Sequence, residues 1–236
     1  MCLAGKKVLI QSNSHVSVYT GLQLAGAEIH ILTPPYCPEA DIYLPVQADQ
    51  VEDYITKNGD IDCIYLTSPN YEGVSANIGL IRERFPEKII AVDEAHGGHF
   101  YFSSELPSTA IEEGADLSTV SVHKTLGSYS GTALVLVSKS SRVAPQTVRN
   151  VKDLFHTSSP SFFLVADVES RVNQMTREGQ VILKNNIEIN TYFWARVRSI
   201  QNLMVHRYQN QDPCKTFLSL RGLNGEEFSN ILQSEF

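Results

Sequence analysis

Short apolar runs rich in β-branched residues alternate with helical patterns over the first two-thirds of the chain, and this alternation most constrains its fold. Apolar residues on consecutive positions are typical of strands buried on both faces of a sheet. Strands that alternate with helices form right-handed crossovers and a mostly parallel sheet. The sequence therefore predicts a three-layer α/β domain. The expected strands are 7–11, 28–32, 63–67, 88–92, 117–122 and 132–137, and the expected helices are 16–25, 51–57 and 78–85.

The last third of the chain has a different pattern. Two sets of apolar residues recur at the spacing of a helix face, which predicts two long helices packed on the sheet or on a partner. A strand is expected at 216–220 and a helix from residue 225 to the end. We expect a major domain at 1–205 and the start of a small C-terminal α+β domain at 206–236. The first apolar set is Leu164, Val168, Val172 and Met175, and the second is Ile189, Phe193, Val197, Ile200 and Met204.

The composition excludes several classes of protein. A net charge of −7 without a long basic run argues against nucleic-acid or anionic-membrane partners. No stretch approaches the roughly 20 apolar residues that a membrane span requires. The four cysteines are scattered and form no CxxC pair, which is typical of reduced thiols rather than of a zinc site or a disulfide framework. The chain is therefore expected to be cytoplasmic.

Four polar clusters follow the expected strands directly. Because ligands of such sheets bind at the carboxyl ends of the strands, these clusters are expected to converge on one edge. Convergence of several clusters is stronger evidence for a site than any one of them. They are SNSH at 12–15, TSPNY at 67–71, DEAH at 93–96 and SVHK at 121–124.

Lys124 is the principal candidate for chemistry. It follows Ser121 and His123 and precedes a glycine-containing turn at 127–131, where a cofactor can approach the backbone closely. A lysine held at the edge of an apolar sheet has its charge disfavoured by desolvation, which is the condition for imine formation. The structural alternative is a lysine that only caps the strand and extends toward water.

Asp93 and His15 also have both structural and functional interpretations. Asp93 can be a helix cap or an ion-pair partner, but a buried carboxylate facing a pyridine nitrogen would keep that nitrogen protonated. His15 can be a surface histidine, or it can stack on a planar ring. The DEAH sequence also occurs in nucleotide-driven helicases, but the GxxxxGK[ST] phosphate loop that they require is absent from this sequence.

Metal binding and hydrolysis are less favoured by the residue pattern. His96 and His99 have the spacing of a metal pair, but no third ligand is near them in the sequence, so no metal is expected. Ser121, His123 and Asp93 are the residue types of a hydrolase triad. The sequence nevertheless contains no G-x-S-x-G elbow.

Beyond these residues, long stretches of the chain resemble the major domain of the fold-type-I pyridoxal-phosphate enzymes. Within that group the chain is similar to the bacterial-type ornithine/lysine/arginine decarboxylases. The similar stretches keep the order of the family and cover most of the chain. They are KVLIQSNSHVSVYTGLQLAGA at 7–27, IYLTSPNYEGVSANI at 64–78, a long segment from VDEAHGGH to SVHKTLGSYSGTALVLV at 92–137, HTSSPSFFLVADVESRV at 156–172 and DPCKTFLSLRGLNGEEF at 212–228.

The resemblance implies roles for individual residues. Lys124 would bind pyridoxal 5′-phosphate as an imine, Asp93 would pair with the pyridine nitrogen and His15 would stack on the ring. His96 would lie near the phenolic oxygen of the cofactor. The phosphate or its surroundings would be contacted by Ser121 and His123. By the same resemblance, Thr157 and Ser158 would reach the cofactor phosphate of a neighbouring subunit, which implies a homodimer or higher oligomer with shared active sites.

The implied activity is decarboxylation of a basic amino-acid substrate (lysine, arginine or ornithine) to its amine, as in polyamine biosynthesis. Two alternatives remain open. One is other chemistry of the same cofactor, as in an aminotransferase or a lyase, because the same lysine and aspartate serve all of these reactions. The other is a truncated, non-catalytic paralogue that dimerises with a full-length enzyme.

This chain also departs from the family pattern. In the family, a Gly-Ser/Thr phosphate-binding loop precedes the strand that begins here at Lys7, and a substrate-recognising C-terminal domain follows. Many relatives have a glutamine near the position of Gly131. We therefore expect a chain that is truncated at both ends. Since a dianionic phosphate without its donors is costly to bury, we also expect weak cofactor binding by this chain alone.

Overall fold

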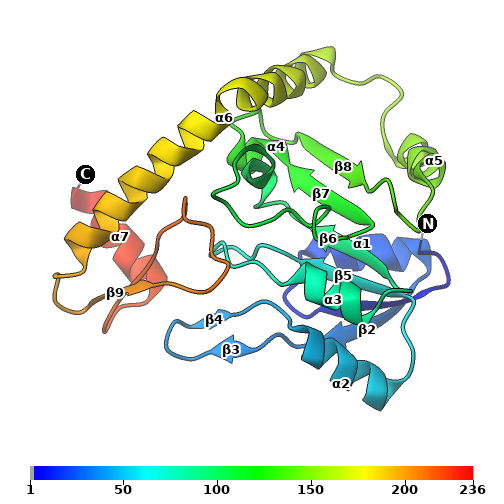
Figure 1. Ribbon diagram of the computed structural model, residues 1–236, viewed down its shortest axis with the longest axis horizontal. Helices are drawn as coiled ribbons and strands as arrows, with labels where there is room; N and C mark the ends of the chain where they lie inside the picture. Colours follow the sequence, from blue (N-terminus) through cyan, green and yellow to red (C-terminus); the bar gives the residue numbers. More distant parts are fainter. Residues whose placement is uncertain (1–2, 236) are drawn as a thin grey trace.

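A six-stranded sheet lies at the centre of the computed structural model, which describes residues 3–235 (Figure 1). The sheet order is β2-β1-β5-β6-β7-β8, and the pairings are parallel except for β7 with β8. The predicted α/β fold with a mostly parallel sheet is thus confirmed. The strands are β1 (Lys7–Gln11), β2 (Glu28–Leu32), β5 (Cys63–Thr67), β6 (Ile89–Asp93), β7 (Leu117–Ser121) and β8 (Ala133–Val137).

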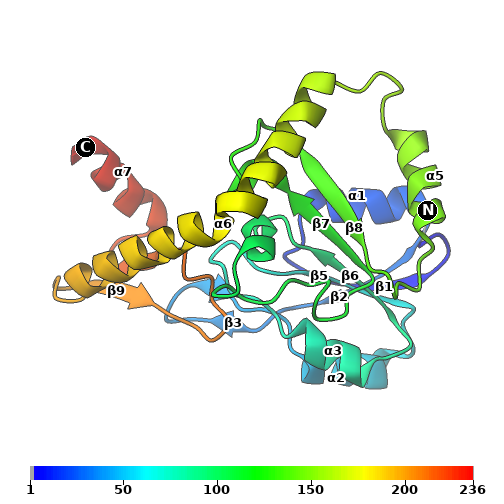
Figure 2. The ribbon, with the colours of Figure 1, turned by 45° about the horizontal axis from the view of Figure 1, so that its top comes forward.

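Helices cover both faces of this sheet. Helix α1 (Val16–Ala25) lies on one face, and α2 (Ala48–Asn58) and α3 (Ile78–Arg84) lie on the other (Figure 2). Successive residues of β1 pack alternately in the hydrophobic clusters on the two faces of the sheet. Val8 and Ile10 pack in the cluster that contains α1, whereas Leu9 packs in the cluster that contains α2 and α3. All three are fully buried, which is why the strand is continuously apolar.

Helix α6 (Phe162–Val197) is a single long helix that connects the sheet region with the C-terminal segment (Figures 1 and 2). It is preceded by α5 (Pro145–Phe155) and packs on η1, a short 3-10 helix at Gly98–Phe102. Gly179 permits the close approach, since a Cβ there would lie 2.8 Å from Cβ of Phe102. The predicted first helix is therefore present within α6.

The prediction of a second helical stripe from Ile189 to Met204 is confirmed as helix only up to Val197 and is wrong beyond it. Helix α6 ends at Val197, Ile200 lies in a turn and Met204 lies in strand β9. Ile189 is 67% exposed and Phe193 is 41% exposed. The buried positions of this part of α6 are Leu183, Trp194 and Val197. Of the predicted repeat, Ile189 and Phe193 are therefore exposed, whereas Val197 at its helical end is buried.

Strand β7 is shorter than the sequence predicts. It ends at Ser121, and Val122 begins the one-turn helix α4 (Val122–Thr125). Val122 is fully buried in a cluster with Phe100, Leu126 and Met175, while its backbone N–H still donates to the carbonyl oxygen of Thr132. Lys124 therefore lies on a helical turn directly after the strand.

The C-terminal segment forms a separate small layer. Strands β9 (Leu203–His206) and β10 (Phe217–Leu220) pair antiparallel, and helix α7 (Gly225–Glu235) follows. The expected strand at 216–220 and the expected C-terminal helix are confirmed, and Phe236 lies outside the described residues. A short hairpin of β3 (Tyr36–Cys37) and β4 (Ile42–Tyr43) was not predicted.

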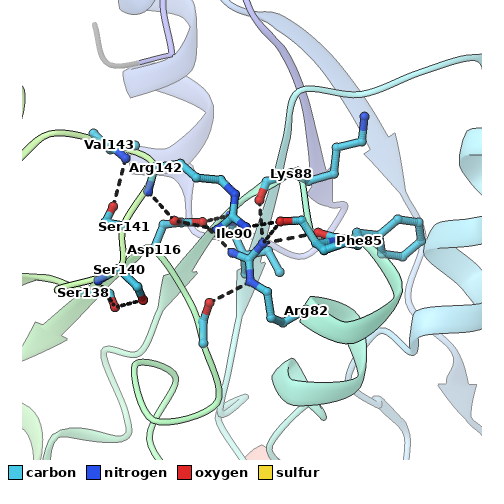
Figure 3. Close-up of polar contacts among 12 residues, drawn as sticks. Arg82, Phe85, Lys88, Ile90, Asp116, Ser138, Ser140, Ser141, Arg142 and Val143 are labelled. Atoms are coloured by element: carbon cyan, nitrogen blue, oxygen red, sulfur yellow. Dashed lines mark hydrogen bonds and ion pairs between the residues drawn. The ribbon is translucent and has the colours of Figure 1, made fainter.

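Asp116 links several segments of the chain at the amino end of strand β7 (Figure 3). Its side chain is 1% exposed and lies just before β7. Oδ2 accepts hydrogen bonds from Arg82 Nη2 (2.5 Å) and from the backbone N–H of Ile90 (2.9 Å). Oδ1 accepts from the backbone N–H of Arg142 (2.7 Å) and from Arg142 Nη1 (3.3 Å). The carboxylate is thus fully paired, as a buried charge must be.

Two further sequence expectations concern membranes and thiols. Among the described helices, none combines the length and the apolarity that crossing a membrane would need. Cys37, Cys63 and Cys214 are free thiols, as predicted, and Cys2 lies outside the described residues.

Candidate active site

A cavity of about 550 Å³ lies at the carboxyl ends of the central strands. The strand order reverses between β1 and β5, and ligands of open α/β sheets bind at such a switch point. Residues of all four polar clusters line this cavity, so the predicted convergence on one edge is found. The lining includes Gln11, Asn13, Ser14, His15, Thr67, Asn70, Tyr71, Asp93, His96, Ser121, His123 and Lys124.

Lys124 reaches the cavity from α4 and meets His96 there. The Nζ atom of Lys124 lies 3.4 Å from Nε2 of His96, and the His96 ring lies 4.6 Å from the ring of Tyr71, centroid to centroid. Burial lowers the pKa of His96 to about 4, and the positive charges of Lys215 and Lys124 act in the same direction. At neutral pH the imidazole of His96 is therefore uncharged and Nε2 can accept a hydrogen bond from the lysine.

Asp93 ends β6 on the same cavity. Its Oδ1 accepts a hydrogen bond from the backbone N–H of Ala95 (3.1 Å). Burial raises the pKa of Asp93, while this hydrogen bond and the nearby Lys124 and His15 oppose the rise. A cation facing the Asp93 carboxylate would therefore be stabilised, because this carboxylate is partly buried and poorly hydrated.

His15 is both a helix cap and a cavity residue. It is the N-cap of α1, and its Nδ1 accepts a hydrogen bond from the backbone N–H of Ser17 (3.2 Å). This bond fixes the ring at the cavity wall. The structural interpretation and the functional one are thus compatible, since capping uses one ring nitrogen and leaves the face of the ring free.

Ser121 and His123 lie on the remaining side of the cavity. Nδ1 of His123 donates a hydrogen bond to the carbonyl oxygen of Thr132 (2.8 Å). The ring nitrogen that a catalytic triad would direct to Asp93 is therefore used by a backbone carbonyl. This geometry agrees with the expectation that Ser121, His123 and Asp93 do not form a hydrolase site.

Thr157 and Ser158 are not brought to this cavity. They lie in the exposed connection between α5 and α6, and they are not among the residues that line the cavity. Ser159 N donates to Thr157 Oγ1 (3.1 Å), a local turn contact.

Sequence reasoning missed Gln11, a polar residue that lines the site. Gln11 Oε1 accepts a hydrogen bond from the backbone N–H of Thr67 (3.0 Å), and Gln11 Nε2 donates to Asn13 Oδ1 (2.7 Å). The buried hydroxyls of Ser14 and Thr67 have no hydrogen-bond partner among the described residues. A buried hydroxyl is costly without a partner, so these two favour a polar ligand in the cavity. Ser14 and Thr67 belong to the polar clusters named from the sequence, whereas for Gln11 the available signal was its position at the end of β1, directly before the first cluster.

These groups fit the cofactor that the sequence suggests. The cavity combines an amine (Lys124), a half-buried carboxylate (Asp93), an imidazole face (His15) and unpartnered hydroxyls (Ser14 and Thr67). Pyridoxal phosphate requires an amine for its aldehyde, an acid for its ring nitrogen and hydrogen-bond donors for its phosphate. The donor set is therefore appropriate for this group.

His99 does not join His96 in the cavity. It is 4% exposed, and its Nε2 lies 2.8 Å from Oδ2 of Asp212. A potential metal ligand atom of Cys214 lies within 4.8 Å of those of His99 and Asp212. The structure thus groups His99 with Asp212 and Cys214, more than 100 positions away in the chain, and not with His96. The buried His99–Asp212 hydrogen bond links η1 to the C-terminal segment, while Nδ1 of His99 has no hydrogen-bond partner among the described residues.

Gly98 controls the position of the turn that carries Lys124. A Cβ at Gly98 would lie 2.8 Å from Oγ1 of Thr125 and 2.8 Å from Cγ1 of Val120. We expect Gly98→Ala to lower the free energy of unfolding by about 1–3 kcal/mol, because α4 or β7 must move. Gly21→Ala is the matched control. It lies within α1 with no atom within 4 Å of the added Cβ, so it should raise stability by roughly 0.5–1 kcal/mol. Urea denaturation measures both, and equal effects would contradict the prediction.

Comparison with known sequences finds one matching family and several similar proteins. The family described as Orn/Lys/Arg decarboxylase, major domain, matches residues 1–226. An arginine decarboxylase of Bacillus cereus is 26% identical over 248 residues, covering 100% of this chain and 54% of that protein. An uncharacterised Bacillus subtilis protein, YaaO, is 30% identical over 171 residues, covering 72% of this chain and 36% of that protein. The chain spans about half the length of the arginine decarboxylases that it matches.

Solved structures share the fold at low sequence identity. The Escherichia coli constitutive lysine decarboxylase superposes with a TM-score of 0.68 at 19% identity, covering 88% of this chain and 32% of that one. A Burkholderia pseudomallei sphingosine-1-phosphate lyase gives a TM-score of 0.70 at 17% identity, covering 98% and 54%. At these identities the likeness shows the fold alone.

Proposed function

The chain belongs to the Orn/Lys/Arg decarboxylase family, and on that premise we propose that it binds pyridoxal phosphate through Lys124 for the decarboxylation of lysine, arginine or ornithine. One observation carries the proposal. The amine of Lys124 and the carboxylate of Asp93, which come from α4 and β6, line one cavity at the switch point of the sheet.

Each residue of the cavity has a proposed task. Lys124 would hold the cofactor covalently, and Asp93 would accept a hydrogen bond from the protonated ring nitrogen. His15 would contact the ring face, and His96 would lie near the phenolic oxygen. Ser121 and His123 would contact the phosphate or its surroundings. Since Nδ1 of His123 already donates to Thr132, only a protonated His123 could also donate through Nε2.

When bound, pyridoxal phosphate supplies an aldehyde that captures an amine and a ring that accepts the electrons of a bond broken at Cα. The chain's own residues would set which bond breaks. Asp93, in its poorly hydrated position, holds a proton on the ring nitrogen more strongly than an exposed carboxylate would. Neutral His96 leaves its Nε2 lone pair available to the amine of Lys124.

A homodimer or higher oligomer with shared active sites forms part of the proposal. The connection that holds Thr157 and Ser158 is flanked by exposed apolar side chains. Leu154 and Phe155 precede it, and Phe162 and Phe163 follow it, each more than 60% exposed. A cluster of exposed large apolar residues is typical of a protein interface. A cytoplasmic location, and a division into a major domain at 1–205 and a small domain from 206, complete the proposal.

The test is a product assay with the purified chain and excess pyridoxal phosphate. Carboxyl-labelled lysine, arginine and ornithine are supplied separately, and released CO2 and the amine are measured. We expect CO2 and amine in equal amounts from one of the three substrates. Formation of a keto acid without CO2 would assign the chain to transamination. A chain that only raises the turnover of a full-length relative would be the non-catalytic paralogue.

A further inference from the structure

Three side chains of metal-binding type lie together where the segment between β9 and β10 contacts η1. One ring nitrogen of His99, one carboxylate oxygen of Asp212 and Sγ of Cys214 lie within 4.8 Å of one another. His99 belongs to η1, and the other two residues belong to the segment that joins the C-terminal strands. None of the three lines the cavity that Lys124 enters. Tertiary contact therefore forms a cluster that is distinct from the proposed cofactor site.

The cluster is largely closed to water. The side chain of His99 is 6% exposed and that of Asp212 is 0% exposed, while Cys214 is partly buried against the apolar cluster that contains Phe100 and Met175. Nε2 of His99 lies 2.8 Å from Oδ2 of Asp212. Because a carboxylate only accepts, Nε2 carries the proton of this bond. Nδ1 of His99 then has a lone pair without a donor among the described residues, so the imidazole has unused capacity to bind a ligand.

Hydrogen bonds hold the backbone around the cluster in place. The backbone N–H of Cys214 donates to Oδ1 of Asp212 (2.8 Å), and Nδ2 of Asn190, on α6, donates to the carbonyl oxygen of Cys214 (2.7 Å). The backbone N–H of Asp212 donates to the carbonyl oxygen of Gly73 (2.8 Å). An ion would therefore meet ligands that the fold has already ordered, and little conformational entropy would be lost on binding.

The chemistry of the three ligands selects the ion. Thiolate and imidazole favour zinc, whereas magnesium and calcium prefer oxygen ligands. One carboxylate, one thiolate and one neutral imidazole around Zn²⁺ give a net charge of zero, so the buried complex carries no uncompensated charge. We propose that His99, Asp212 and Cys214 bind one Zn²⁺ ion, with the fourth tetrahedral position left for water. The sequence argument expected no metal because it considered His99 only together with His96.

Binding requires a small rearrangement and the release of one proton. Zinc bonds of about 2.0–2.3 Å place ligand atoms roughly 3.3–3.8 Å apart, so the separations in this cluster change by about 1 Å. Burial and the charge of Asp212 raise the pKa of Cys214 to about 12, so the free thiol is protonated at neutral pH. Its proton passes to water when the sulfur binds the ion. The His99 ring loses no proton, since a neutral imidazole has one lone pair in either tautomer.

The experiment titrates the full 236-residue chain with Co²⁺ and Zn²⁺ after metal has been removed with a chelator, and without pyridoxal phosphate. Cobalt replaces zinc, and a cobalt–thiolate bond gives a charge-transfer absorbance that oxygen and nitrogen ligands do not produce. Zinc affinity is measured by competition with a chromophoric chelator. The variants are Cys214→Ser and Asp212→Asn. The matched control is Cys37→Ser, because Cys37 is also a partly buried free thiol. Thermal melting without metal checks that each variant folds.

We expect one ion per chain and a thiolate band in the unmodified chain and in Cys37→Ser. Cys214→Ser should lack the band and bind zinc about 100-fold more weakly, since losing a ligand costs at least as much as losing a group that orients one. Asp212→Asn keeps an acceptor for His99 but loses the charge, and it should weaken zinc binding by about tenfold or more. Absence of the band in the unmodified chain would overturn the proposal, and so would a band that remains in Cys214→Ser.

Melting in the presence of zinc provides a second measurement. An ion that binds only the folded chain raises its melting temperature, so zinc should stabilise the unmodified chain and should have little effect on Cys214→Ser. An equal shift in both forms would place the ion elsewhere and contradict the proposal. Because no cofactor is present, these results do not depend on whether Lys124 forms an imine with pyridoxal phosphate.

Discussion

Lys124→Ala is expected to eliminate the imine that the chain forms with pyridoxal phosphate. Its Nζ is the lysine amine that lines the cavity with Asp93, and an alanine supplies no nucleophile. Absorbance of the imine should fall to the baseline at every cofactor concentration. Reduction with borohydride followed by peptide mapping should find the label on the peptide that contains residue 124 in the unmodified chain and should find none there in the variant.

The control for this loss is Lys139→Ala, an exposed lysine that follows β8. It should form the imine as the unmodified chain does. The cofactor is supplied in excess to both forms, so that a difference in affinity does not hide imine formation. Retention of the imine band in Lys124→Ala would show that another lysine reacts and would remove the basis of the proposed function.

Asp116→Ala is expected to lower the free energy of unfolding by about 3–5 kcal/mol, the largest stability effect that we predict. The substitution leaves the backbone N–H groups of Ile90 and Arg142 without their buried acceptor, and it leaves Arg82 without its carboxylate. Urea denaturation measures the change. Asp153→Ala is the matched control, because the side chain of Asp153 is 66% exposed and forms a surface ion pair with its neighbour Lys152. Its effect should stay within about 0.5 kcal/mol.

The pH dependence of stability provides a second check on Asp116. Burial acts to raise the pKa of this carboxyl, but hydrogen bonds from the Arg142 and Ile90 amides and the charge of Arg82 outweigh it, and the pKa lies below the usual value. The stabilisation is therefore present above the ordinary aspartate range and is lost as the pH falls through the lowered pKa. Asp116→Ala should flatten this acid-side loss. Equal acid sensitivity in both forms would contradict the assignment.

The local sequence predicted the sheet well because residues of the central strands are buried on both faces of the sheet. Val8, Leu9 and Ile10 are all buried because helices cover both faces, and this produces a continuous apolar run. The same pattern failed along α6. There, apolar repeats at Ile189 and Phe193 lie on an exposed face, so periodicity showed a helix face without showing what covers it.

The candidate site was only partly visible in the sequence. Lys124, Asp93, His96 and His15 follow strands directly, and parallel strands bring their carboxyl ends to one edge. Thr157 and Ser158 lie in the exposed connection between α5 and α6 and do not line the cavity. Lys215 and Asp212 come from the distant C-terminal segment, and no spacing rule connects them with Tyr71 or His99.

The sequence alone determined the α/β sheet, the order of its elements along the chain and the edge on which polar groups meet. These features follow from apolar runs and from the alternation of strands and helices, which can be recognised in short stretches of sequence. The tertiary structure decided how those groups interact. It placed Lys124 on a helical turn instead of a strand end, since α4 begins at Val122, whose side chain packs with Phe100 and Leu126. It also brought Lys215 to Tyr71, because backbone pairing between residues 73–75 and 210–212 joins segments that are far apart in the chain.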